Sequence, residues 1–197
     1  MLKVFYTAPS KQFESMQSIY TEIKRILVER LNTQLTWDFV GTTLEKLRNN
    51  IRELSKDDWK KIYKGLIDAL LESDIAIFEN TISSFSTGYL AGIAISKEIP
   101  TLVLMDKKVQ HTFKGSFIEG ITSPYLTVVH YSSLNDLYNA IKNFVDIHSD
   151  PSKTTSFHLK LTKSEKLFID HMSQKLGISK IDFIRALLAK EMMKKKE

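Results

Sequence analysis

Two uninterrupted apolar runs constrain the fold of this chain more than any other feature of its sequence. Residues 75–78 read Ile-Ala-Ile-Phe and residues 101–105 read Thr-Leu-Val-Leu-Met, without the polar–apolar alternation of a strand that has one wet face. Strands of this kind are buried on both sides, as in a parallel sheet covered by helices on both faces. We therefore predict an α/β fold with a five-stranded, parallel, Rossmann-like sheet flanked by helices.

The remainder of the first 147 residues alternates between strand-like and helix-like patterns, as expected for successive βαβ units. Two pairs of residues, Ser55 with Asp58 and Ser133 with Asp136, have the spacing of helix-capping pairs. The strands are expected at about residues 2–8, 35–40, 74–79, 100–105 and 125–131, and the helices at about 11–31, 56–72, 87–97 and 134–147.

The pattern changes in a polar stretch that contains Pro151, which predicts a linker at residues 148–154. We expect one domain at residues 1–147 and a small module at residues 155–197. The linker and the module carry the excess positive charge, because residues 151–197 hold eleven Lys/Arg against five Asp/Glu, leaving seventeen against eighteen elsewhere. Such asymmetry suits contact with phosphates, and it equally suits a solvated, solubilising tail.

The small module has the order strand, helix, helix. Residues 156–161 alternate strictly, Thr162 and Glu165 form a capping box, and Gly177 ends the first helix before Ser179 caps the second. A single strand and two short helices enclose little core by themselves. The sequence therefore predicts pairing with a second chain.

This module resembles the ribbon-helix-helix repressors typified by Arc, in which two chains each give one strand to a ribbon that enters the major groove. The resemblance implies double-stranded DNA as a partner and a homodimer, or a higher even oligomer. It implies base contacts by Ser156, His158 and Lys160. It also implies a backbone-phosphate contact around Ser179 and Lys180, where the second helix begins. A module used for dimerisation alone would have the same pattern.

Three loops of the larger domain are expected to converge beyond the carboxyl ends of the strands, where ligands of such sheets bind. They are residues 7–11, residues 79–88 and residues 106–115. The second loop is rich in hydroxyl groups and reaches Gly88, which we expect at the start of a helix, where free N–H groups could hold an anion. A turn that only caps the helix would have the same composition.

Most of residues 1–147 resemble the nucleoside 2-deoxyribosyltransferase family, which includes deoxynucleoside-monophosphate hydrolases, and the resemblance is strongest over residues 74–104. The strand at 74–79, the turn at 83–89 and the helix after it carry the likeness. These enzymes cleave N-glycosidic bonds with a glutamate nucleophile in a Gly-Tyr-Glu-Leu-Gly motif. Residues 88–92 here read Gly-Tyr-Leu-Ala-Gly, and Leu90 cannot perform a nucleophilic attack.

At two other positions this chain also differs from the catalytic residues of the family. The aspartate of the preceding helix aligns near Leu66, two residues from Asp68, and the tyrosine after the first strand's core aligns with Phe5. The resemblance implies that a serine at position 84 contacts phosphate, and it places position 116 one residue from a serine that the partner subunit supplies in the family. The predicted ligand-binding residues are Phe5, Tyr6, Ala8, Glu79, Ser84, Gly88, Tyr89 and Ser116.

Three functions remain open on the sequence. In the first, the chain is a DNA-binding transcriptional regulator whose degenerate enzyme domain senses a nucleoside or nucleotide. In the second, it is an enzyme that cleaves N-glycosidic bonds with Glu79 or Asp68. In the third, the domain is only an oligomerisation platform. We favour the regulator. The chain has no cysteine and no recognisable metal-ligand spacing, so we expect neither a metal nor a resident cofactor. It has no apolar run of membrane-spanning length, so we expect a cytoplasmic protein without a membrane partner.

Overall fold

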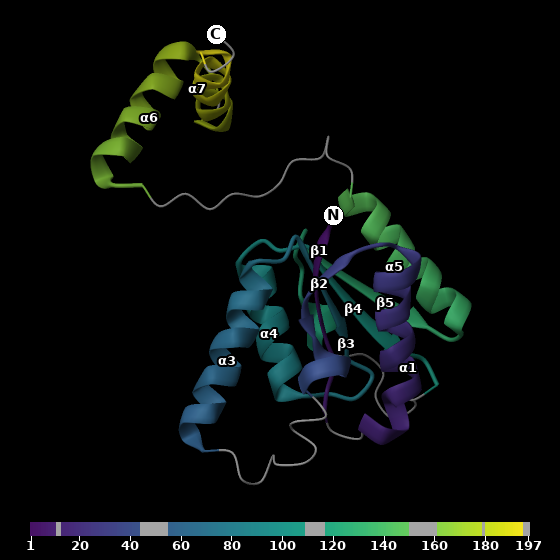
Figure 1. Ribbon diagram of the computed structural model, residues 1–197. Coiled ribbons are helices and arrows are strands. Elements are labelled where there is room, and N and C mark those ends of the chain that lie inside the picture. The colour runs from purple at the N-terminus through teal and green to yellow at the C-terminus, as the bar shows by residue number, and fades with distance from the viewer. Residues whose placement is uncertain (11–12, 44–54, 109–116, 150–160, 179, 195–197) are drawn as a thin grey trace. The chain divides into compact units, whose positions relative to one another are not determined.

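The computed structural model describes residues 1–10, 13–43, 55–108, 117–149, 161–178 and 180–194 (Figure 1). The chain divides into two compact units, Met1–Ser156 and Phe157–Glu197, and each is described by itself. No helix of the described residues is long and apolar enough to cross a membrane.

The first unit is a five-stranded, wholly parallel sheet, as the apolar runs predict. Its strand order is β2-β1-β3-β4-β5. Strand order therefore reverses between β1 and β3, and the crevice beyond their carboxyl ends is where such sheets bind ligands. The strands are β1 (Lys3–Thr7), β2 (Gln34–Asp38), β3 (Ile75–Glu79), β4 (Thr101–Asp106) and β5 (Leu126–Tyr131).

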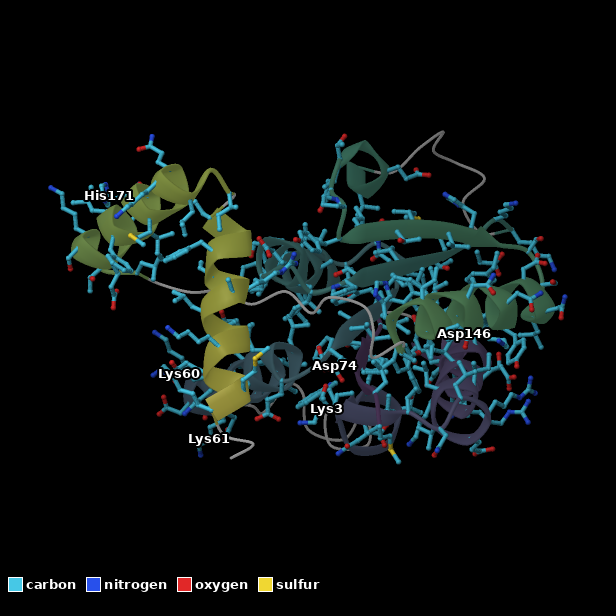
Figure 2. The ribbon with its side chains drawn as sticks, turned by 90° about the horizontal axis from the view of Figure 1, so that it is seen from above. Lys3, Lys60, Lys61, Asp74, Asp146 and His171 are labelled. Atoms are coloured by element: carbon cyan, nitrogen blue, oxygen red, sulfur yellow. The ribbon has the colours of Figure 1, made fainter. Side chains whose placement is uncertain are left out.

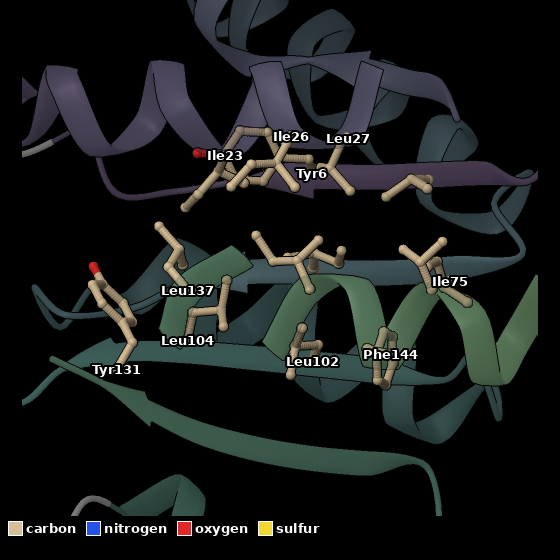
Figure 3. Packing of buried hydrophobic residues seen from close by; sticks show 14 residues of the cluster. Tyr6, Ile23, Ile26, Leu27, Ile75, Leu102, Leu104, Tyr131, Leu137 and Phe144 are labelled. Atoms are coloured by element: carbon tan, nitrogen blue, oxygen red, sulfur yellow. The ribbon is translucent and has the colours of Figure 1, made fainter. Parts of the chain in front are cut away.

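Helices cover both faces of the sheet, as the continuous burial of β3 requires. Side chains of β3 alternate: Ile75 and Ile77 pack with α1 and α5, whereas Ala76 and Phe78 pack with α3 and α4. Figure 3 shows the first of these layers, with side chains from α1 and α5 against the strands. Among the described residues of this unit, these helices are α1 (Phe13–Arg25), α3 (Lys56–Leu71), α4 (Phe85–Ser96) and α5 (Leu134–Ser149).

Local sequence signals set the ends of several elements. Ser55 and Asp58 form the expected capping box at the start of α3. At α5 the N–H of Asp136 donates to Ser133 Oγ at 3.1 Å, but the carboxylate of Asp136 accepts from Ser132 instead of Ser133. At the amino ends of the strands, the side chain of Asp74 accepts a hydrogen bond from the N–H of Lys3 at 2.7 Å and thereby ties β3 to β1 (Figure 2).

Two predicted elements end earlier than expected. The single helix predicted at residues 11–31 is α1 followed by a π-helical segment, η1 (Ile26–Arg30), whose wider turn still buries Ile26 and Leu27. The strand predicted to reach residue 40 stops at Asp38, and a second π-helical segment, η2 (Phe39–Thr43), follows. One short 3₁₀ segment, η3 (Phe117–Gly120), lies between β4 and β5.

The described part of the second unit is a pair of helices, α6 (Lys163–Leu176) and α7 (Lys180–Lys194). The capping box of Thr162 and Glu165 is confirmed, and Gly177 ends α6 with a φ of 65°. Phe168 and Phe183 pack edge to face across the pair, with ring centroids 6.1 Å apart. The strand predicted at residues 156–161 lies outside the described residues except for Leu161, so the ribbon itself stays a prediction.

Candidate functional site

Glu79 occupies the centre of the sheet's carboxyl edge, as the last residue of β3. Its neighbours at that edge are Thr7, at the end of β1, and Leu104, its register partner on β4. The side chain points to the α1 and α5 side, because it follows Ile75 and Ile77 in the alternation of β3. Glu79 has no exposed surface.

One oxygen of the Glu79 carboxyl group accepts three hydrogen bonds. The N–H of Thr81 donates to Oε1 at 3.2 Å, the hydroxyl of Thr81 donates to it, and the hydroxyl of Tyr131 donates at 3.1 Å. Thr81 Oγ1 in turn accepts the N–H of Asp106 at 2.7 Å, which ties the turn after β3 to the end of β4. Oε1 is therefore rigidly held by neighbouring segments.

Burial raises the pKa of Glu79 to about 7, from an ordinary value of 4.5. The donors from Thr81 and Tyr131 act in the opposite direction, because they stabilise the ionised form, and the negative charge of Asp106 raises the pKa further. The group is thus close to half protonated at neutral pH. A carboxyl group in this state can donate or accept a proton.

Three buried tyrosines surround this carboxyl group. Tyr6 donates its hydroxyl to the carbonyl of Tyr20 at 3.2 Å. Burial, followed by the charge of Glu79, raises the pKa of Tyr6, of Tyr20 and of Tyr131, so all three stay protonated. The described surroundings of Glu79 therefore include neutral hydroxyl donors, and no cation is among the groups that shift its pKa.

Several buried polar atoms at this edge have no hydrogen-bond partner within the described residues. They include Oε2 of Glu79, the hydroxyl of Tyr20 and the side-chain oxygen of Asn80. An unpaired buried polar atom costs about 1–3 kcal/mol, so such atoms call for a ligand group or a water molecule. A hydroxyl group suits Glu79 Oε2 and the Tyr20 hydroxyl, because it can donate to one and accept from the other.

The start of α4 differs from the prediction. The helix begins at Phe85 with Ser84 as its N-cap, two residues before the expected start. The N–H of Gly88 is bonded to the carbonyl of Ser84 at 3.0 Å, so it cannot hold an anion. The N–H groups without an acceptor inside the helix belong to Phe85, Ser86 and Thr87. The side chain of Ser84 makes no capping bond.

The other predicted ligand-binding residues lie in different surroundings. Phe5 is wholly buried in the α3 and α4 layer, 5.9 Å from the ring of Phe78, and Ala8 is buried in an aromatic cluster with Tyr20. Tyr89 is half exposed and bonds Tyr63 through their hydroxyls at 3.0 Å. Predicted residues that lie outside the described residues are Ser116, Ser156, His158, Lys160 and Ser179. Lys180 is described and pairs with Asp170 at 2.6 Å.

The two carboxylates considered for catalysis are placed differently. Asp68 is exposed one turn before α3 ends, and because α3 leads into β3, it lies towards the amino ends of the strands. Glu79 alone of the pair lies at the carboxyl edge of the sheet, the edge at which sheets of this type bind ligands. Leu90 is buried on α4 and packs in the apolar layer, so no carboxylate replaces the nucleophile at that position.

Sequence reasoning missed Thr81, Tyr20 and Tyr131. Each belongs to a different segment, and only folding brings them around Glu79. The one sequence signal was Thr81 two residues after Glu79, at the spacing of a side-chain turn. Within the described residues, no group of three or more His, Cys, Asp or Glu could hold a metal ion.

No protein-family model and no curated protein matches this chain. Among solved structures, a CMP N-glycosidase from Clostridium botulinum is similar, with 15% identity, a TM-score of 0.50, and coverage of 72% of this chain and 98% of that one. A 2-deoxyribosyltransferase from Bacillus psychrosaccharolyticus is 14% identical over 70% of this chain and 90% of its own, with a TM-score of 0.47. The likeness to the glycosidase establishes a shared α/β fold.

Proposed function

We propose that the first unit binds a nucleoside or nucleotide at the carboxyl end of its sheet, with Glu79 as the buried anchor. The observation that carries this proposal is the state of the Glu79 carboxyl group. Its Oε1 is held by three donors, whereas its buried Oε2 has no partner in the described chain. A buried acid of this kind, at the point where strand order reverses, is typical of a ligand site.

For each part of a nucleotide, a group that could bind it lies close to Glu79 along the chain. A sugar hydroxyl would donate to Glu79 Oε2. A phosphate would bind the N–H groups at the start of α4 together with the hydroxyl of Ser84. A base would stack on the exposed ring of Phe85 or on Tyr89, whose planes are 17° apart.

Cleavage of the N-glycosidic bond is the second candidate function of this site. Two observations favour it: the fold is shared with a CMP N-glycosidase, and the pKa of Glu79 is about 7. In that reaction protonated Glu79 would give its proton to the departing base as the C1′–N bond breaks, and the water molecule that adds to C1′ would return a proton to the Glu79 carboxylate. Leu90 excludes the family's covalent route through that position, because its side chain has no nucleophilic atom.

We propose further that the second unit binds double-stranded DNA as a homodimer, which would make the chain a regulator that responds to its ligand. The charge balance of residues 151–197 supports this, as do the helix pair α6 and α7 and the capping box at the start of α6. Lys180 would have to exchange Asp170 for a phosphate, and both side chains are partly exposed, so the exchange costs little. Base contacts by residues 156, 158 and 160 remain part of this proposal.

One set of measurements separates these functions. The purified chain is incubated with nucleosides and nucleoside monophosphates, then examined for a rise in melting temperature and for free base by chromatography. A melting shift that disappears in Glu79→Gln, but persists in the exposed-carboxylate control Asp68→Asn, supports binding. Free base that disappears in the same variant supports the enzyme. The absence of both signals contradicts the proposed site.

The DNA-binding proposal needs its own test. Gel-shift titrations over a range of salt should show binding that weakens as salt rises, because bound lysines release counterions from DNA. Lys180→Ala should lower affinity for all duplexes and flatten the salt dependence by about one counterion. If no duplex binds at low salt, the DNA proposal is wrong, and ligand binding at Glu79 is unaffected by that result.

A further inference from the structure

The two oxygens of the buried Glu79 carboxyl group have opposite surroundings. Oε1 lies against three hydrogen-bond donors, which are the N–H and the hydroxyl of Thr81 and the hydroxyl of Tyr131. Oε2 is buried as well, and it has no hydrogen-bond partner among the described residues. A neutral carboxyl group carries its proton on one of its two oxygens, so this asymmetry bears on where the proton lies.

The donors at Oε1 disfavour a proton on that oxygen. The N–H of Thr81 can only donate, so Oε1 is the acceptor in that contact. The hydroxyl oxygen of Thr81 accepts the N–H of Asp106 at 2.7 Å, and the hydroxyl hydrogen is thereby turned towards Oε1. A proton on Oε1 would face both of these hydrogens, whereas no described hydrogen-bonding group lies within reach of Oε2.

We infer that the folded chain confines the proton of neutral Glu79 to Oε2, and that Thr81 is the positioning residue that keeps it there. Neutral Glu79 then presents a hydrogen-bond donor at Oε2, and ionised Glu79 presents an acceptor. Thr81 acts through Glu79 and itself need not touch a ligand. Its N–H and its hydroxyl both contact Oε1, so one residue supplies two of the three donors.

Four other ionisable side chains of the described residues interact with the charge of Glu79. They are Tyr6 of β1, Tyr20 of α1, Tyr131 of β5 and Asp106 of β4. Burial keeps the three tyrosines protonated, so they cannot take up the Glu79 proton. The negative charge of Asp106 favours the neutral form of Glu79. Both effects keep the proton on Glu79 until a ligand meets Oε2.

The position of the proton determines which ligand group can meet Oε2, and this step rests on the nucleoside or nucleotide binding proposed above. Neutral Glu79 requires an acceptor, such as a sugar oxygen, a carbonyl oxygen or an unprotonated ring nitrogen of a base. A ligand that offers only N–H groups there would leave the Oε2 hydrogen unpaired and bind about five- to a hundredfold more weakly. In N-glycosidic cleavage, Oε2 would be the oxygen that releases the proton to the base.

Difference infrared spectroscopy of the full chain tests the proton position without any ligand. Spectra below and above the titration midpoint of Glu79 isolate its carboxyl C=O band, which Glu79→Gln should remove. If Oε2 carries the proton, Oε1 is the C=O oxygen. Thr81→Val should then move the band to higher frequency, because the C=O bond accepts one hydrogen bond fewer. The midpoint should rise by about one to two pH units, since the ionised form loses a donor. Thr81→Ser keeps the hydroxyl and should restore both values.

The matched control is Thr101→Val, which removes another buried threonine hydroxyl. That hydroxyl donates to the carbonyl of Ile99 at 2.8 Å, at the amino end of β4, so the band and the midpoint should not change. Tyr131→Phe removes a different donor from Oε1 and should move the band in the same direction as Thr81→Val, so the test does not depend on the folding of one variant.

A Glu79 band that stays in place in both Thr81→Val and Tyr131→Phe puts the proton on Oε1 and overturns the inference. The lack of any band that Glu79→Gln removes overturns it as well, because Glu79 then carries no proton. Failure of nucleosides to bind a chain whose band moves as expected refutes the proposed function alone.

Discussion

Replacing Glu79 by glutamine should change how the stability of the first unit depends on pH. In the unfolded chain the carboxyl group ionises near its ordinary pKa of 4.5, whereas in the folded chain it keeps its proton until about pH 7. Folding therefore takes up a proton between these two values. The stability that this group gives is full below the unfolded pKa and is lost as pH rises through the folded pKa.

The size of the effect follows from the width of this window. Each pH unit over which only the folded state is protonated is worth about 1.4 kcal/mol. The native chain should therefore lose about 3 kcal/mol of unfolding free energy across the window of Glu79, whereas the glutamine variant carries no titrating group there. The carboxyl group is wholly buried, so screening by solvent does not reduce this figure much.

Urea unfolding followed by tryptophan fluorescence measures the effect, because both tryptophans, Trp37 and Trp59, lie in the first unit. The difference in unfolding free energy between Glu79→Gln and the native chain should move in the variant's favour by about 3 kcal/mol between about pH 4 and about pH 8. Comparing the two proteins across pH cancels the constant cost of placing a buried amide. A difference in unfolding free energy that does not change with pH would refute the raised pKa of Glu79.

Three further substitutions have expected outcomes. Tyr131→Phe removes a donor from Glu79 Oε1, so the pKa of Glu79 should rise further and the pH window of the previous experiment should extend upward. Gly41→Ala should lower the free energy of urea unfolding by at most about 1 kcal/mol, because its Cβ would displace the partly exposed carboxylate of Asp38 from its ion pair with Lys24. Gly177 has a φ of 65°, so Gly177→Ala should lower the unfolding free energy of the second unit by about 1–2 kcal/mol. The melting temperature followed by circular dichroism of the helices should fall, whereas the midpoint followed by tryptophan fluorescence should not change.

The sheet was predictable from sequence because burial on both faces leaves a local signature. The runs at residues 75–78 and 101–105 identify β3 and β4 without knowledge of their neighbours. The starts of helices also have a local signal, because a capping residue such as Ser55 at α3 or Thr162 at α6 acts within the first turn of its own helix. The π-helical end of α1 has no such signature, because an extra residue in a turn leaves the amphipathic pattern nearly unchanged.

The surroundings of Glu79 could not be predicted in the same way. Tyr131 lies 52 residues away in sequence, and its hydroxyl reaches the carboxyl group only because β5 and β3 both flank β4. Position along a strand indicates which edge a residue occupies, so Glu79 was a candidate. Its burial and its raised pKa depend on side chains from other segments, and a single sequence does not reveal which of them meet.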